Sequence, residues 1–378
     1  MEKVLFKDLF LFEKKSTIKA GGGLLLGEGK YPFYTSSNTL TKSIDNFQFD
    51  RESLIFGTGG MASIHICSVP FAVSTDCFVT QAYDLKKVFT KYVFYYLSGN
   101  IHLLENGFKG AGLKHISKDY LQKIEIPLPS LSEQKAIAQK LDKAQEIIHY
   151  NEKIIAQYDA LTQSLFLDMF GSNSPNYIFW EETKIEDIAL KAKGSMRTGP
   201  FGSDLLHSEF VDNGIAVLGI DNAVNNKFEW NQRRFITEEK YSKLQRYRVY
   251  PSDIIITIMG TIGRVAVVPE NIGIAINTKH LAAITLNQKI VNPEFIAYTL
   301  YSDKNVLSQI RQNGKGAIMT GLNLSIIRSL RFKLPPIELQ NQFAERVKAI
   351  ERQKQLTQES LDQSKALFNS LLQQSFKN

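Results

Sequence analysis

The chain carries the same segment twice, and this constrains its fold more than any other feature. Residues 109–141 read KGAGLKHISKDYLQKIEIPLPSLSEQKAIAQKL, and residues 315–347 read KGAIMTGLNLSIIRSLRFKLPPIELQNQFAERV. The two segments align without a gap at a constant offset of 206 (315 − 109). Upstream, the turn GTGG at 57–60 matches GTIG at 260–263, at an offset of 203 (260 − 57). A repeat on this scale predicts two related structural units.

Each copy ends in a long stretch with helical periodicity, 131–170 in the first and 337–378 in the second. Apolar residues follow one another in steps of four and three, which is typical of a coiled-coil seam. Its principal positions are Ile137, Leu141, Ile148, Ile155, Phe343, Val347, Leu361 and Phe368. We expect Ser132 and Glu133 to cap the first helix. The alternatives are a surface helix on its own domain and an antiparallel pair between two domains; two matched copies favour the pair.

The segments before each helix read as mixed α and β structure. Short β-rich runs, DIIITIM at 253–259 and RVAVVP at 264–269, alternate with short helical runs such as PEFIAYTLYS at 293–302. The sequence therefore predicts an α+β fold with two mixed α/β domains in tandem, separated by two long helices that form an antiparallel coiled coil, as a pseudo-twofold repeat. The expected boundaries are 1–129 and 172–335 for the domains, and 130–171 and 336–378 for the helices.

Charge is distributed unevenly between these parts. The chain of 378 residues has 45 basic and 38 acidic side chains. Together, the two helical stretches hold 10 of the basic and 11 of the acidic side chains. The rest of the chain therefore has 35 basic and 27 acidic side chains, a net charge of 35 − 27 = +8. A basic excess on the globular parts suits a nucleic-acid partner. With only Cys67 and Cys77, no leader and no apolar run long enough to span a membrane, we expect a cytoplasmic protein.

Enzyme motifs are not evident in the sequence. LLLGEGKY at 24–31 lacks the first glycine and the Ser/Thr of a phosphate-binding loop, and NSPNY at 173–177 is not a methyltransferase motif. His65 and Cys67 are not followed by a second ligand pair, so the pattern of a structural zinc site is not met. The glycine-rich turns are either tight strand-to-strand turns or amide surfaces for phosphate. Likewise, the basic loops at 109–114 and 314–321 could follow a DNA backbone or serve as hinges.

Several segments together resemble the DNA specificity subunits of type I restriction–modification systems. They are YPFYTSSN at 31–38, IPLPSLSEQKAIAQKLD at 126–142, GPFGSDLLHSEFVDNGIAVLGIDN at 199–222 and LPPIELQNQFAERV at 334–347. The likeness spans essentially the whole chain. One departure is Leu339, which replaces the glutamate of the family's Glu-Gln pair in the second copy while Gln340 remains.

This resemblance implies a non-catalytic subunit that binds duplex DNA. Two target-recognition domains would each read one half of a split, asymmetric site, and the paired helices would hold the half-sites at a fixed spacing. The chain itself would need no cofactor and would not contact a membrane. Its partners would be methyltransferase subunits, two of them, which use S-adenosylmethionine on adenine, and restriction subunits that use ATP and Mg.

The candidate DNA-contacting residues are polar or basic side chains in loops, of the types that bind phosphates or base edges. They are Ser36, Asn38, Lys109, Lys114, Arg197, Ser203, Arg233, Arg234, Lys279 and Lys315. Two other functions stay open at this point: a tandem methyltransferase or nuclease with unrecognised motifs, and a helical adaptor that binds only proteins.

Overall fold

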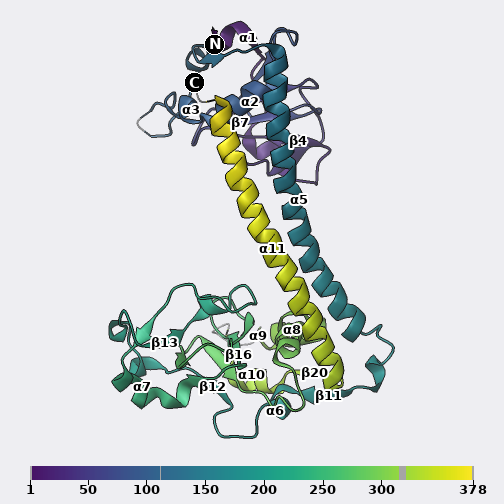
Figure 1. Ribbon diagram of the computed structural model, residues 1–378, viewed down its shortest axis with the longest axis vertical. Coiled ribbons are helices and arrows are strands. Elements are labelled where there is room, and N and C mark those ends of the chain that lie inside the picture. Colours follow the sequence, from purple (N-terminus) through teal and green to yellow (C-terminus); the bar gives the residue numbers. More distant parts are fainter. Residues whose placement is uncertain (1, 111, 315–320, 377–378) are drawn as a thin grey trace. The chain divides into compact units, whose positions relative to one another are not determined.

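The computed structural model describes residues 2–110, 112–314 and 321–376. The chain divides into two compact units. The first comprises residues 1–155 and 356–378, and the second comprises residues 156–355. Each unit contains one globular segment and part of each of the two long helices, α5 (Leu131–Phe170) and α11 (Ile337–Phe376) (Figure 1).

The described residues of the first unit form three small sheets. One has the strand order β2-β9-β6-β7, another has the order β3-β5-β4-β8, and β1 pairs with β10. Helix α2 packs against β6 and β7 and buries Tyr92, Val93 and Leu97. The strands are β1 Lys3–Leu5, β2 Phe10–Phe12, β3 Leu24–Leu25, β4 Tyr31–Tyr34, β5 Lys42–Ile44, β6 Ser53–Gly57, β7 Ser63–Cys67, β8 Ala72–Val73, β9 Cys77–Ala82 and β10 Glu125–Pro127. The helices are α1 Phe6–Leu9, α2 Thr90–Gly99, α3 His102–Glu105 and α4 Lys118–Gln122.

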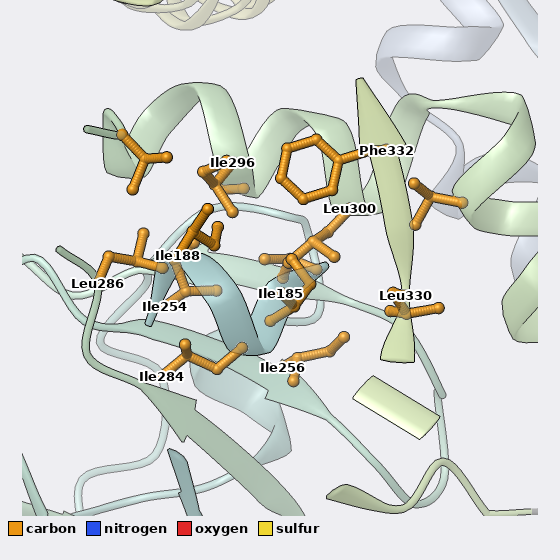
Figure 2. Close-up of a cluster of buried hydrophobic side chains, with 14 of the residues drawn as sticks. Ile185, Ile188, Ile254, Ile256, Ile284, Leu286, Ile296, Leu300, Leu330 and Phe332 are labelled. Carbon is orange, nitrogen blue, oxygen red and sulfur yellow. The ribbon is translucent and has the colours of Figure 1, made fainter. Parts of the chain in front are cut away.

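The second unit repeats this plan. Its sheets have the orders β12-β19-β16-β17 and β14-β13-β18-β15, and β11 pairs with β20. Isoleucines of β16 and β19 pack with those of α6 and with α8 and β20 in a continuous core (Figure 2). The strands are β11 Glu181–Lys184, β12 Met196–Thr198, β13 Ile215–Leu218, β14 Phe235–Ile236, β15 Arg248–Val249, β16 Ile254–Thr257, β17 Val265–Val267, β18 Ala275–Asn277, β19 Leu281–Ile284 and β20 Arg331–Leu334. The helices are α6 Ile185–Ile188, α7 Glu238–Leu244, α8 Pro293–Ser302, α9 Lys304–Gly314 and α10 Leu324–Ser329.

The sheet orders confirm the repeat that the sequence predicts. Strands β2, β9, β6 and β7 correspond in order to β12, β19, β16 and β17. Each unit also contains one parallel pair among antiparallel strands: β4 with β8, and β13 with β18. The copies differ at the edges, where β3 pairs with β5 in the first and β15 pairs with β18 in the second.

The two long helices, α5 Leu131–Phe170 and α11 Ile337–Phe376, pack together in antiparallel fashion. In the first unit, Leu141 near the start of α5 lies in one cluster with Phe368 and Leu371 near the end of α11. In the second unit, Phe166 near the end of α5 lies 5.7 Å, between ring centroids, from Phe343 near the start of α11.

Burial along both helices follows the predicted seam. On α5, Leu141 and Ile148 are buried and Ile137 and Ile155 are half-buried. On α11, Phe343 and Leu361 are buried, while Val347 and Phe368 are half-buried. The neighbouring positions outside the seam are mostly exposed, as a narrow contact stripe requires.

Helix α5 begins at Leu131, as its periodicity predicts, but its cap differs from the prediction. Ser130, not Ser132, caps the helix, because the Ser130 Oγ accepts from the Glu133 backbone N–H at 3.4 Å. The Glu133 carboxylate in turn accepts from the Ser130 N–H at 2.9 Å, which completes a reciprocal capping box. The Ser130 hydroxyl also donates to the Glu133 carboxylate at 2.6 Å, and this bond, together with the one from the Ser130 N–H, lowers the pKa of the Glu133 carboxyl. The prediction was wrong for Ser132, which already lies inside the first helical turn, whereas Glu133 takes part in the cap as predicted.

Candidate nucleic-acid interface

In the first unit, the glycine-rich turn and the basic loop lie against each other. The backbone N–H of Gly60 donates to the Lys114 carbonyl at 3.3 Å, and that of Ile116 donates to the Thr58 carbonyl at 3.1 Å. Gly60 has a φ of +82°, a conformation that favours glycine. The lysine side chains at 109 and 114 are exposed. The turn therefore supports a loop that presents two cations.

A third segment, Ser36–Asn38, joins the same surface. The Ser36 hydroxyl donates to the Asp76 carbonyl at 2.7 Å and accepts from the Gly59 N–H at 3.3 Å. The hydroxyl of Ser36 thus anchors the turn, whereas Asn38 is exposed. Because β4 and β8 are parallel, their carboxyl ends reach this edge together, and Ser36 and Asp76 follow directly from those ends.

In the second unit, the ends of the corresponding parallel strands also meet the glycine-rich turn. The Thr278 N–H donates to the Leu218 carbonyl at 2.9 Å, and the Ile258 N–H donates to the His280 carbonyl at 2.9 Å. Ile220 lies beside the turn 260–263, since a Cβ on Gly260 would come within 3.1 Å of its Cδ1. These contacts place the ends of the parallel strands β13 and β18 next to the glycine-rich turn, as in the first unit.

Basic side chains cluster near this surface of the second unit. Arg234 forms an ion pair with Asp221, and its side chain is 21% exposed. The guanidinium of Arg233 lies over the Trp230 ring, with its Cζ 5.1 Å from the ring centroid. Arg233 and Lys279 are exposed. Partial burial lowers the pKa of His280, and the charges of Lys279 and Arg234 act in the same direction, so this histidine stays neutral near pH 7.

Arg197 has a different environment from the other candidates. Its side chain is 7% exposed and pairs with Asp253, which is completely buried. Its Nε donates to the Arg248 carbonyl at 2.7 Å and its Nη1 donates to the Thr285 hydroxyl at 3.0 Å. This guanidinium is occupied by the protein interior, and we leave it out of the DNA-contacting set.

Two predicted DNA-contacting residues, Ser203 and Lys315, have no described contact with these surfaces. Ser203 is exposed in the 3₁₀ turn Gly202–Asp204. Lys315 and the rest of the loop 315–320 lie outside the described residues.

Metal binding finds no support in the part of the chain that is described, where no three His, Cys, Asp or Glu side chains gather around a common point. His65 Nε2 instead lies 2.8 Å from the Ser37 carbonyl oxygen. Among the same residues, no helix has both the length and the apolar composition needed to cross a membrane.

Sequence reasoning missed three residues of these surfaces. His115 lies with its Nδ1 3.1 Å from the Thr58 carbonyl, Asp221 pairs with Arg234, and Trp230 supports Arg233. The repeat gave no signal for them because the copies carry different residues at these loops. The aromatic-basic run EWNQRRF at 229–235 was the only available hint.

Comparison with known proteins agrees with this arrangement. The model of the type I restriction modification DNA specificity domain matches residues 1–158 and again residues 178–365. The EcoBI specificity subunit of Escherichia coli is 26% identical over 349 residues, covering 85% of this chain and 71% of that protein. The MjaVIII specificity subunit of Methanocaldococcus jannaschii is 25% identical over 297 residues, covering 74% of this chain and 68% of that protein.

Solved structures show the same fold. The S subunit of a type I restriction–modification system from M. genitalium matches with a TM-score of 0.62 at 16% identity, over 100% of this chain and 96% of that one. A chain from a study of complex assembly and conformational transition in a type I system matches with a TM-score of 0.59 at 14% identity, over 100% and 97%. With the domain model matched twice, this chain belongs to the family of type I restriction–modification DNA specificity subunits, the non-catalytic subunits that recognise the target sequence.

Proposed function

We propose that each unit reads one half of a bipartite duplex target through the surface around its glycine-rich turn. The observation that carries this proposal is that the glycine-rich turn meets the ends of two parallel strands in both units, while the side chains presented there differ. The first unit presents Asn38, Lys109 and Lys114, and the second presents Arg233 and Lys279. Equivalent surfaces with unlike side chains suit two unlike half-sites.

The proposed contacts divide by chemistry. Lys109, Lys114 and Lys279 are flexible exposed cations, which suit phosphates and give affinity without sequence preference. Arg233, held over Trp230, has a restricted guanidinium that suits the O6 and N7 atoms of guanine. Arg234 is next to Arg233 in the chain, and its guanidinium is oriented by Asp221. In the first unit, Ser36 positions the glycine-rich turn. Ser203 and Lys315 stay candidates as further polar contacts of the second unit.

We further propose that residues 1–129 and 172–335 act as the two recognition domains and that 130–171 and 336–378 are the spacer segments. The helices would then fix the number of base pairs between the half-sites. Two methyltransferase subunits, one for each copy of the repeat, would place S-adenosylmethionine beside an adenine in each half-site. Restriction subunits would supply the chemistry that needs ATP and Mg, and the complex would work in the cytoplasm.

The test is to reconstitute the chain with its methyltransferase subunits, modify a genome and sequence its methylated bases. One split motif, with two different halves and a single spacing, is expected. A contiguous motif, or methylation by this purified chain without its partners, would overturn the proposal. A chain that binds only proteins would show no salt-sensitive binding to duplex DNA in the assembled complex.

A further inference from the structure

Two buried glutamines join the long helices to their units in the same way. Gln134, in the first turn of α5, and Gln340, in the first turn of α11, are both 0% exposed. They occupy the same place in the repeat, at an offset of 206 (340 − 134). Each uses its side-chain amide to bind the segment that leads into α2 or α8.

The hydrogen bonds are equivalent one by one. Gln134 Oε1 accepts from the Phe89 N–H at 2.8 Å, and Gln340 Oε1 accepts from the Asn292 N–H at 2.9 Å. Gln134 Nε2 donates to the Lys87 and Pro129 carbonyls at 3.1 and 2.9 Å. Gln340 Nε2 donates to the Ile290 and Pro335 carbonyls at 3.3 and 2.8 Å. One amide thus holds three segments together: the helix, the strand exit before it and the loop before the neighbouring helix.

A second polar link at this joint is not shared by the two copies. In the first unit, Asp142 on α5 pairs with Lys91 at 2.9 Å and accepts from the Tyr95 hydroxyl at 2.7 Å. At the corresponding positions the second copy has Lys348 on α11 and Glu294 on α8, so the charges are reversed. The glutamine amide, in contrast, is a polar link that both joints retain.

Only an uncharged amide satisfies these partners. The site offers one backbone donor and two backbone acceptors, and glutamine supplies one acceptor and two donors. A glutamate would face two carbonyl oxygens without a proton to donate, and an apolar side chain would leave all three backbone groups unpaired. The identity of the residue is therefore set by the joint and not by helix propensity.

A small change at this joint has a large effect at the other end of the helix. A helix of 40 residues is about 60 Å long. A tilt of about 5° at its first turn would move its far end by about 5 Å, which exceeds the rise of about 3.4 Å per base pair.

We infer that Gln134 and Gln340 are positioning residues that fix the angle at which each spacer helix leaves its unit, and that they thereby restrict the complex to one half-site spacing. The inference deepens the proposed function and rests on it. Neither glutamine needs to contact DNA, since both are enclosed at the helix starts.

The first test measures the joint itself, without DNA. Spin labels on Asp50→Cys and Lys153→Cys, both exposed positions of the first unit, report the distance between the globular segment and α5. The native cysteines are buried. In the full chain, Gln134→Met should broaden the distance distribution, and the exposed neighbour variant Gln139→Glu should leave it unchanged. An unchanged distribution in Gln134→Met would overturn the inference.

The second test measures spacing in the assembled complex. A complex that contains Gln134→Met should methylate the same two half-sites at several spacings: the native spacing and those one base pair shorter or longer. If circular dichroism shows that Gln134→Met is unfolded, Gln340→Met takes its place. Gln139→Glu and the exposed Gln342→Glu should keep the single native spacing. A lower melting temperature with one unchanged spacing would show a merely structural role. If the native complex shows no split motif, the proposed function fails, while the spin-label result still decides whether the joint is fixed.

Discussion

Arg197 on β12 and Asp253 just before β16 form a buried ion pair in the second unit, with side chains 7% and 0% exposed. Arg197 also donates to the carbonyl of Arg248 on β15, in the other four-stranded sheet. Asp253 accepts from the Tyr250 N–H at 2.9 Å. The pair therefore links the two four-stranded sheets of this unit, and its first consequence is for the stability of the fold.

We expect Arg197→Met to destabilise the second unit by about 3–5 kcal/mol, because it leaves a buried carboxylate without its partner. Denaturant unfolding of the full chain would measure this change. The control is Arg233→Met, an exposed arginine over Trp230, which should change stability by at most about 1 kcal/mol. Equal effects of the two substitutions would contradict the structural role of Arg197.

The same variant should acquire a distinctive dependence on pH. Burial raises the pKa of the Asp253 carboxyl, and the charge of Arg197 opposes that rise. Without Arg197 the folded pKa should rise further above the unfolded value of about 3.9, so the folded state binds the proton more tightly than the unfolded state. The variant should therefore gain stability relative to the native chain as the pH falls through the raised folded pKa towards the unfolded value of about 3.9. Unfolding curves across that range would test this, and a loss of relative stability on acidification would contradict it.

Neutralising an exposed lysine of the proposed surfaces should weaken DNA binding about equally on all sequences. For Lys109→Gln, Lys114→Gln and Lys279→Gln, each made alone, we expect the slope of log affinity against log salt to flatten by roughly one if the lysine contacts a phosphate. Lys243→Gln serves as the control, because Lys243 pairs with Glu239 on α7. Titrations of the assembled complex at several salt concentrations provide the measurement. If all three variants keep the native slope, these surfaces do not face the duplex.

Much of the fold was accessible from the sequence because its signals are local or repeated. The helical run at 293–302 matches α8, and the apolar run at 253–259 contains β16. The seam positions follow from spacing alone. The parallel pair β13 and β18 was not predicted, since its strands lie far apart in the chain and are each only a few residues long.

The candidate site was less predictable, for a related reason. Loop composition indicated which residue types can bind DNA, but not which of them the fold would bury. The sequence around Arg197 resembles that of an ordinary loop arginine. In the structure, Arg197 is buried and pairs with Asp253, which lies 56 residues away in the sequence. Similarly, the hydroxyl of Ser36 is committed to Asp76, 40 residues along the chain. Partners so distant in the sequence cannot be predicted from local sequence patterns.

Lengthening the paired helices should lengthen the spacing between half-sites. Asn151 on α5 lies opposite Ser360 on α11, with Nδ2 to Oγ at 3.3 Å. Four residues inserted at both positions add about 6 Å and rotate each helix by about 40° beyond a full turn. That corresponds to one or two base pairs of B-DNA, which rises about 3.4 Å per pair and turns once in about 10–10.5 pairs.

The expected product is an active complex with the same half-sites and a spacer longer by one or two base pairs, as read by methylome sequencing. A matched insertion of two residues rotates each helix by about 200° and should abolish specific methylation, because it turns the seam away from its partner. A fully active four-residue variant with the native spacer would show that the helices do not set the distance.

The most direct measurement of the central claim is the methylome of a complex in which residues 1–128 are replaced by the first globular segment of another family member. Each unit has its own sheets, core and glycine-rich turn surface, so the two should recognise DNA independently. We predict that one half-site changes to that of the donor while the other half-site and the spacing stay as they were. A change in both half-sites together, or in neither, would contradict the account.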